Sequence, residues 1–135
     1  MRAYLDFYGA APPDADVVAL SRALLADPEH EGVQLLARDA AGVARGFATL
    51  YWSWATTTAK RTAIMNDLFV APEARGSGLA EALIAACRDR AREHGAATLE
   101  WQTATDNARA QAVYDRVGGV RSQWVDYSLP TSTDA

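Results

Sequence analysis

The chain has 135 residues, half of them hydrophobic, which suits one compact domain with a buried core and is too short for two domains. Its 13 basic and 17 acidic side chains give a formal net charge of −4, which argues against general affinity for nucleic acid or for an anionic membrane surface. A single cysteine excludes an internal disulfide, and no apolar run approaches the roughly 18 residues of a membrane span. We therefore expect one cytoplasmic domain over residues 1–129 and a polar tail over residues 130–135.

The first half of the chain predicts one strand, one helix and a hairpin. Residues 2–8 alternate apolar and polar side chains, which favours a strand. Apolar side chains at helical spacing follow and predict a helix over residues 14–27. Two strand-like runs, residues 33–37 and 43–54, flank a loop with the composition of a hairpin turn.

A strand over residues 62–70 leads into a short glycine loop, Arg75-Gly76-Ser77-Gly78. A long helix should follow, because apolar side chains recur every four residues at Leu79, Leu83, Cys87 and Ala91. Gly95 is placed to end that helix.

The last third predicts a strand over residues 97–103, a short helix over residues 107–117 and a final strand over residues 121–129. Hairpin strands pair antiparallel, whereas a strand-helix-strand unit gives a parallel pair. The expected order βαβββαβαβ therefore predicts an α+β fold with a mixed sheet.

The glycine loop has the composition of an anion site. Gly76 and Gly78 let backbone N–H groups crowd together, and the helix that follows adds unpaired donors and the positive end of its dipole. A plain surface turn is the alternative. A dinucleotide fingerprint is excluded, because Glu81 stands where a third small residue is needed.

Two motifs resemble those of the GCN5-related N-acetyltransferase (GNAT) superfamily. The stretch from Arg75 to Ala80 matches its acetyl-CoA loop, R/Q-x-x-G-x-G/A, and Asn107, Ala110, Tyr114 and Gly118 match its second signature. The resemblance implies a central, mostly antiparallel twisted sheet flanked by three to four helices. It also implies acetyl-CoA as cosubstrate and direct transfer of its acetyl group to a primary amine in a ternary complex.

The resemblance further implies which residues bind the cofactor. Backbone groups of Leu68, Phe69 and Val70 would pair with the pantetheine arm, and the loop donors would bind the pyrophosphate. Asn107 would contact CoA, cap the short helix, or do both. The residues expected at the cofactor are Leu68, Phe69, Val70, Arg75, Gly76, Ser77, Gly78, Leu79, Ala80 and Asn107.

Tyr114 matches the residue that protonates the leaving thiolate in the family. A phenol with a pKa of about 10 can protonate a thiolate whose conjugate thiol has a pKa of about 8.5, once the two are in hydrogen-bond reach. Tyr114 also lies on an apolar stripe of its helix, so a role as a core tyrosine with its hydroxyl at the rim is the alternative.

The sequence leaves the identity of the general base undecided. Asn66 stands where related diamine acetyltransferases carry a glutamate, and Asn cannot take a proton. Asp67 should point to the opposite face of the strand, because side chains alternate. Glu100 matches a base of ribosomal-protein acetyltransferases. A solvated strand carboxylate at this position, with proton loss to water, is the alternative.

The acceptor is expected to be a small-molecule or peptide amine. Trp52 and Trp54, near Tyr51, could hold an ammonium group by cation–π contact, or they could pack in the core. The expected acceptor-binding residues are Trp52, Trp54 and Asn66. Neither histidine has metal-ligand spacing, so no metal is expected. We also expect a homodimer. A non-catalytic acetyl-CoA-binding or partner-binding domain is the competing class.

Overall fold

The computed structural model describes residues 1–132, so residues 133–135 of the expected polar tail lie outside the described part. Its helices are α1 (Arg2–Phe7), α2 (Asp14–Ala26), α3 (Leu79–Glu93) and α4 (Ala108–Arg116); its strands are β1 (Gly32–Arg38), β2 (Ala44–Ala55), β3 (Lys60–Val70) and β4 (Thr98–Glu100); a short 3₁₀ turn, η1 (Pro72–Ala74), follows β3. No helix within residues 1–132 combines the length and apolar character needed to cross a membrane.

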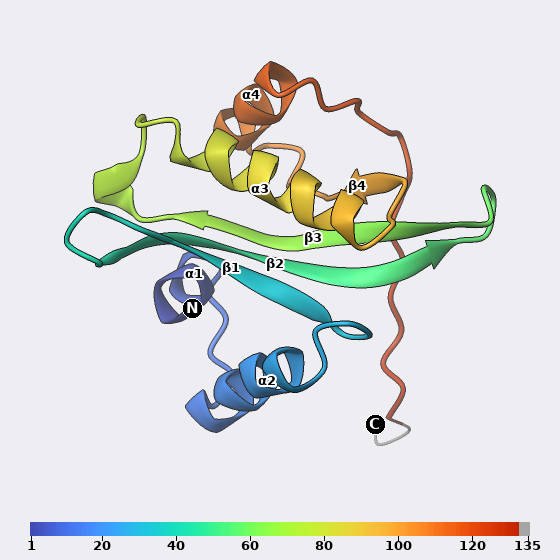
Figure 1. Cartoon of the computed structure of the whole chain (residues 1–135), viewed down its shortest axis with the longest axis horizontal. Helices are drawn as coiled ribbons and strands as arrows, with labels where there is room; N and C mark the ends of the chain where they lie inside the picture. Colours follow the sequence, from blue (N-terminus) through green and yellow to red (C-terminus); the bar gives the residue numbers. More distant parts are fainter. Residues whose placement is uncertain (133–135) are drawn as a thin grey trace.

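The four strands form one sheet in the order β1-β2-β3-β4. β1 pairs antiparallel with β2, β2 antiparallel with β3, and β3 parallel with β4. Helices α1 and α2 cover one face, and α3 and α4 cover the other (Figure 1). The expected α+β fold, with a mixed and mostly antiparallel sheet, is confirmed.

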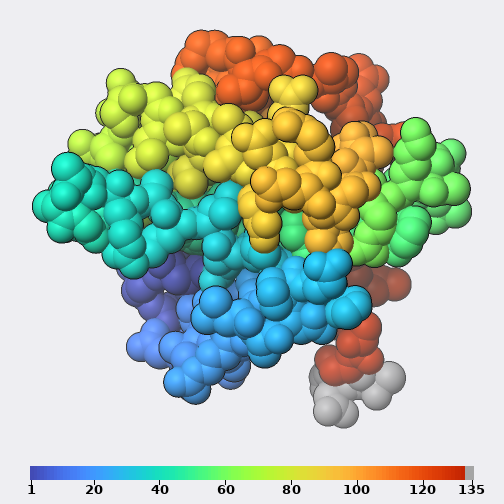
Figure 2. All heavy atoms as spheres, viewed as in Figure 1, coloured from blue at the N-terminus to red at the C-terminus, as the bar shows by residue number. Residues whose placement is uncertain are grey.

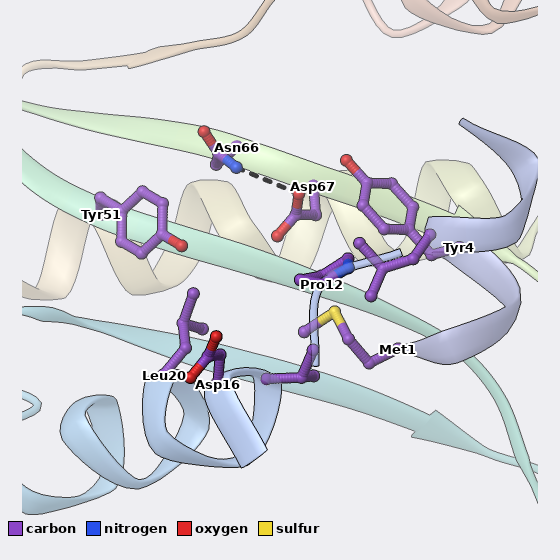
Figure 3. A pocket seen from close by; sticks show the side chains of 10 residues that line it. Met1, Tyr4, Pro12, Asp16, Leu20, Tyr51, Asn66 and Asp67 are labelled. Atoms are coloured by element: carbon purple, nitrogen blue, oxygen red, sulfur yellow. Dashed lines mark hydrogen bonds between the residues drawn. The ribbon is translucent and has the colours of Figure 1, made fainter. Parts of the chain in front are cut away.

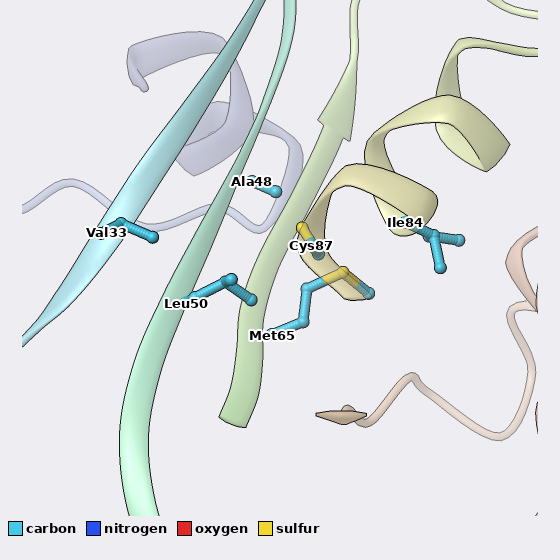
Figure 4. Packing of buried hydrophobic residues seen from close by; sticks show 6 residues of the cluster. All are labelled: Val33, Ala48, Leu50, Met65, Ile84 and Cys87. Carbon is cyan, nitrogen blue, oxygen red and sulfur yellow. The ribbon is translucent and has the colours of Figure 1, made fainter. Parts of the chain in front are cut away.

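The main core lies between the sheet and α3 (Figure 4). The strands contribute Leu50 and Met65, among others, and α3 contributes Ile84 and Cys87. Cys87 is fully buried, and burial raises the pKa of its thiol to about 11. The thiol therefore stays protonated near neutral pH and serves as a small packing group.

Residues 2–8 were predicted as a strand, and this prediction is wrong, because α1 is a helix. Tyr4 and Tyr8 lie one helical turn apart on one side, with ring centroids 5.0 Å apart. The ring of Tyr4 also contacts Phe47 and Phe69 of the sheet, with centroids 5.5 Å and 6.3 Å away. A short apolar pattern fits either period, and packing on these two rings favours the helix.

The strand predicted over residues 97–103 is shorter than expected. Only Thr98–Glu100 pairs with β3, in register with residues 62–64. The chain then leaves the ladder, and the ring of Trp101 packs edge-on against Tyr114 with a centroid distance of 5.4 Å. Trp101 thus packs against α4 where the predicted strand would have continued.

The final strand, predicted over residues 121–129, is absent from the described sheet. This segment, which we call the C-terminal arm, runs without backbone ladder partners from α4 toward the opposite face of the sheet (Figure 1). Its last described residues stand out from the molecular surface (Figure 2). The local pattern favours an extended chain, but a strand also needs a partner, which local sequence does not supply.

Candidate active site

The sheet opens where β3 and β4 diverge. The two strands pair only over Thr62–Ile64, whereas β3 continues to Val70. In the described part of the chain, the edge of β3 beyond Ile64 has no strand partner on the β4 side. Backbone donors and acceptors on such an edge can pair with an extended ligand arm.

The glycine loop joins this open edge to α3. Gly76 and Gly78 have φ angles of 76° and 81°, a conformation that side chains with a Cβ rarely adopt. Gly78 is the N-cap of α3, and no side chain caps this helix start. The first backbone N–H groups of α3 therefore face the loop, where they can bind an anion.

Side chains of the loop hold its shape. The Nε of Arg75 donates to the carbonyl of Val70 at 3.3 Å, and the Oγ of Ser77 donates to the carbonyl of Ala74 at 2.5 Å. The exposed Arg75 keeps its terminal guanidinium nitrogens for an anion at the loop.

Helix α4 carries the second motif. The Asn107 side chain accepts a hydrogen bond from the backbone N–H of Ala110 at 3.2 Å, so it is the N-cap of α4. Arg116 donates to Glu81 in the first turn of α3 at 2.7 Å. This ion pair links the tyrosine-bearing helix to the helix that starts at the glycine loop.

Tyr114 is half-buried against the core between α3 and the sheet. Burial, and to a lesser extent Tyr8, raises the pKa of its hydroxyl above the ordinary value of 10.0. Tyr8 directly follows α1, which lies on the opposite face of the sheet (Figure 1). Tyr114 therefore remains protonated near neutral pH.

A β-bulge interrupts β3 beside this opening. Thr49 pairs with Asp67 and Leu50 with Met65, which leaves Asn66 without a partner on β2. Asn66 and Asp67 consequently lie on the same face of the sheet, and Nδ2 of Asn66 donates to Oδ1 of Asp67 at 3.0 Å. The expectation that Asp67 points away from Asn66 is therefore wrong, because the bulge breaks the alternation of side chains.

Both residues line a pocket of about 260 Å³ between the sheet and helices α1 and α2 (Figure 3). Tyr4 and Tyr51 form part of its wall. Burial and a hydrogen bond to Asp67 raise the pKa of Tyr4, and burial and the charge of Asp67 raise that of Tyr51. Sequence reasoning missed Tyr4, because its segment was assigned to a strand; the i, i+4 spacing of Tyr4 and Tyr8 is the signal that could have found it.

Glu100 lies at the last paired position of β4, opposite Ile64 of β3. It is exposed, and its Oε1 accepts hydrogen bonds from the hydroxyls of Thr62 at 3.2 Å and Thr98 at 3.0 Å. Glu100 is thus one strand away from the bulge, and it does not line the pocket.

The two tryptophans lie outside the pocket. Trp52 packs on the core face of the sheet, stacks on His94 at 3.9 Å and donates from Nε1 to the carbonyl of Pro28 at 2.7 Å. Trp54 is 64% exposed, with Arg61 located 5.0 Å from its ring centroid. Tyr51, which directly precedes Trp52 in β2, faces the pocket instead, because neighbouring side chains alternate.

An open edge in a mixed sheet, beside an uncapped helix start and a glycine loop, suits a protein that binds an extended anionic cofactor. The model of the Acetyltransferase (GNAT) family matches residues 1–119, and the chain belongs to that family. The chain is therefore an acetyl-CoA-dependent N-acetyltransferase.

Relatives support this assignment. The chain is 36% identical over 115 residues to the uncharacterized N-acetyltransferase YhfO of Bacillus subtilis (strain 168), covering 85% of this chain and 75% of the relative. The structure of a probable acetyltransferase matches with 31% identity and a TM-score of 0.80, over 98% of this chain and 87% of that one. An aminoglycoside acetyltransferase from an uncultured soil metagenomic sample matches with 27% identity and a TM-score of 0.73, over 95% and 80% of the two chains.

Proposed function

We propose that the protein transfers the acetyl group of acetyl-CoA to a primary amine by direct attack in a ternary complex. One observation carries the proposal: the open edge of β3 borders the glycine loop, the Asp67 pocket on one face and the Tyr114 helix on the other. Residues 1–129 would act as one catalytic domain. The cytoplasm, where acetyl-CoA is available, is the proposed compartment.

The residues around the opening suit CoA. The backbone N–H groups from Gly76 to Ala80, together with Arg75, would bind the pyrophosphate. The backbone of residues 68–70 would pair with the pantetheine arm, and Asn107 would add a contact from the start of α4. Bound acetyl-CoA supplies an activated thioester; the protein supplies binding and proton transfer.

Tyr114 would act as the general acid. The amine nitrogen forms a bond to the acetyl carbon, the carbon–sulfur bond breaks, and the departing thiolate takes the proton of the Tyr114 hydroxyl. Tyr114 then recovers a proton released by the amine nitrogen. Its raised pKa keeps the proton in place until the thiolate forms.

Glu100 remains the proposed base. It lies one strand from the bulge and would accept the ammonium proton through water before attack. The hydroxyls of Thr62 and Thr98 donate to its carboxylate and hold the side chain in place.

Thiol release from acetyl-CoA across a panel of amines tests this function, with acetyl-CoA binding measured separately by calorimetry. Turnover with at least one amine is the expected result. Tight acetyl-CoA binding without turnover of any amine would favour the alternative, a non-catalytic acetyl-CoA-binding or partner-binding domain, for which Asn66 at the usual base position is the supporting feature.

We also propose a homodimer formed through the C-terminal arm. Trp124 and Tyr127 are 89% and 92% exposed, and Val125 and Leu129 are also exposed. Aromatic side chains bury about 150 to 250 Å² each, so two exchanged arms would approach the roughly 1,200 Å² of a small stable interface. The short edge strand β4 offers backbone groups for pairing.

A further inference from the structure

The pocket between α1, α2 and the sheet contains a buried carboxylate without a cationic partner. Asp67 is 8% exposed, and none of the ion pairs within residues 1–132 includes it. Buried carboxylates are normally paired with a cation, because an isolated buried charge is strongly unfavourable. The positive charge that completes this site is therefore expected from a ligand.

The neighbours of Asp67 prepare it to bind a cation. The Asn66 amide donates a hydrogen bond to the carboxylate, and Tyr4 lines the same pocket close enough to Asp67 for that carboxylate to raise the pKa of the Tyr4 hydroxyl. A carboxylate offers about four acceptor positions, so the one Asn66 donor leaves others unused. The oxygen that Asn66 does not contact points into the pocket (Figure 3).

The remaining walls limit what can accompany the cation. Leu5, Val17 and Leu20 line the pocket with the ring of Tyr51, so most of the surface is apolar. A volume of about 260 Å³ admits a compact group and is smaller than most drug-sized sites.

Asp16 is the other carboxylate of the pocket wall, and it has a different explanation. It is exposed and lies in the first turn of α2, where the helix dipole favours a negative charge. Asp16 therefore does not require a second ligand cation.

We propose that Asp67 binds the ammonium group of the acceptor, and that the acceptor is a primary monoamine with a compact alkyl or aryl body. This inference rests on the proposed function. Polyamines and aminoglycosides would place further cations against the apolar wall, which is unfavourable. Tyr4, which lines the pocket beside Asp67, acts as a positioning residue for that carboxylate.

The first experiment compares acceptors and a matched pair of variants. Phenethylamine and isopentylamine are expected to give a higher kcat/KM than spermidine, putrescine, an aminoglycoside or a dipeptide. The variant D67N should raise the KM for phenethylamine about 10- to 100-fold, the effect of losing a charge-assisted contact. The control D16N should change this KM less than about twofold, because an exposed charge contributes little. A preference for spermidine together with equal losses in D16N and D67N would overturn the monoamine assignment.

A binding measurement separates this inference from the proposed function. NMR titration of phenethylamine and of the neutral isostere 1-phenylpropane is run with wild-type protein and D67N. Wild-type protein should bind phenethylamine more tightly than the neutral isostere. In D67N, most of this difference in affinity between the two compounds should disappear. Equal affinity of D67N and wild type for phenethylamine would overturn the role of Asp67, whether or not any amine is acetylated.

Folding and cofactor controls complete the design. D67N should retain acetyl-CoA affinity by calorimetry, and its free energy of unfolding should equal or exceed that of wild type, because it removes a buried charge. Y4F keeps the ring on Phe47 and Phe69 and should raise the KM for phenethylamine with little change in kcat. A fall in kcat alone in Y4F would contradict the positioning role.

Discussion

Asn66 donates a hydrogen bond to the side chain of Asp67, its neighbour in sequence, at 3.0 Å. Adjacent residues of a regular strand point to opposite faces, so this contact exists only because β3 bulges at Asn66. The same bulge brings Asp67 into the pocket, next to the edge where β3 parts from β4. The extra residue in the bulge, Asn66, thus places the pocket next to the strand edge where the cofactor is expected to bind.

Replacing Gly78 with alanine should weaken acetyl-CoA binding by about tenfold or more, because a Cβ at positive φ is strained by about 1 to 2 kcal/mol and distorts the donors of the loop. Calorimetric titration measures this effect. Gly42 has the same φ of 81° in the β1–β2 turn and is the matched control. Gly42→Ala should lose similar stability and keep its affinity; equal loss of affinity in both variants would contradict a specific role for the loop.

Replacing Tyr114 with phenylalanine should lower kcat about 100-fold or more, the usual contribution of a positioned general acid. Stability should change little, because the ring contact with Trp101 is kept. Steady-state thiol release and urea unfolding check the two effects. An unchanged kcat would leave Tyr114 as a core residue with its hydroxyl at the rim.

The protein should lose stability as the pH rises above about 10, the ordinary pKa of tyrosine. The pKa values of Tyr4, Tyr51 and Tyr114 are raised in the folded protein. Below the ordinary value both states are protonated; above it the unfolded chain ionises first, which favours unfolding. Urea unfolding at increasing pH measures the effect, and Tyr4→Phe should make the fall shallower. A flat profile for wild type would contradict the burial of these hydroxyls.

Replacing Trp124 and Tyr127 of the C-terminal arm with serine should convert the proposed homodimer into a monomer, because the substitution removes the largest exposed apolar side chains of the arm. Light scattering coupled to size exclusion gives the mass. Leu25→Ser, which removes an 82% exposed apolar side chain from α2, is the control and should leave the dimer intact. A wild-type monomer, or a dimer unaffected by the double substitution, would contradict the arm as an interface.

Local signals predicted the glycine loop, α3 and α4 well. The glycines, the four-residue apolar repeat and the Asn107 cap act within a few residues, so they can be identified from sequence. The pocket could not be predicted in this way. It depends on the bulge at Asn66 and on packing of Tyr4 against two strands, which are contacts distant in sequence.

The sequence also did not show which tyrosine or tryptophan of β2 faces the pocket. Side-chain alternation along β2 and the position of α1 decide that Tyr51 faces the pocket and that Trp52 packs on the core face. The C-terminal arm has a strand-like pattern, yet pairing depends on a neighbouring edge that its own residues do not specify.

The most direct measurement is mass spectrometry of the products formed from acetyl-CoA and phenethylamine by the purified protein. The account predicts N-acetylphenethylamine and CoA in equal amounts, with formation of both slowed in D67N. Acetyl-CoA binding without any acetylated amine would contradict it.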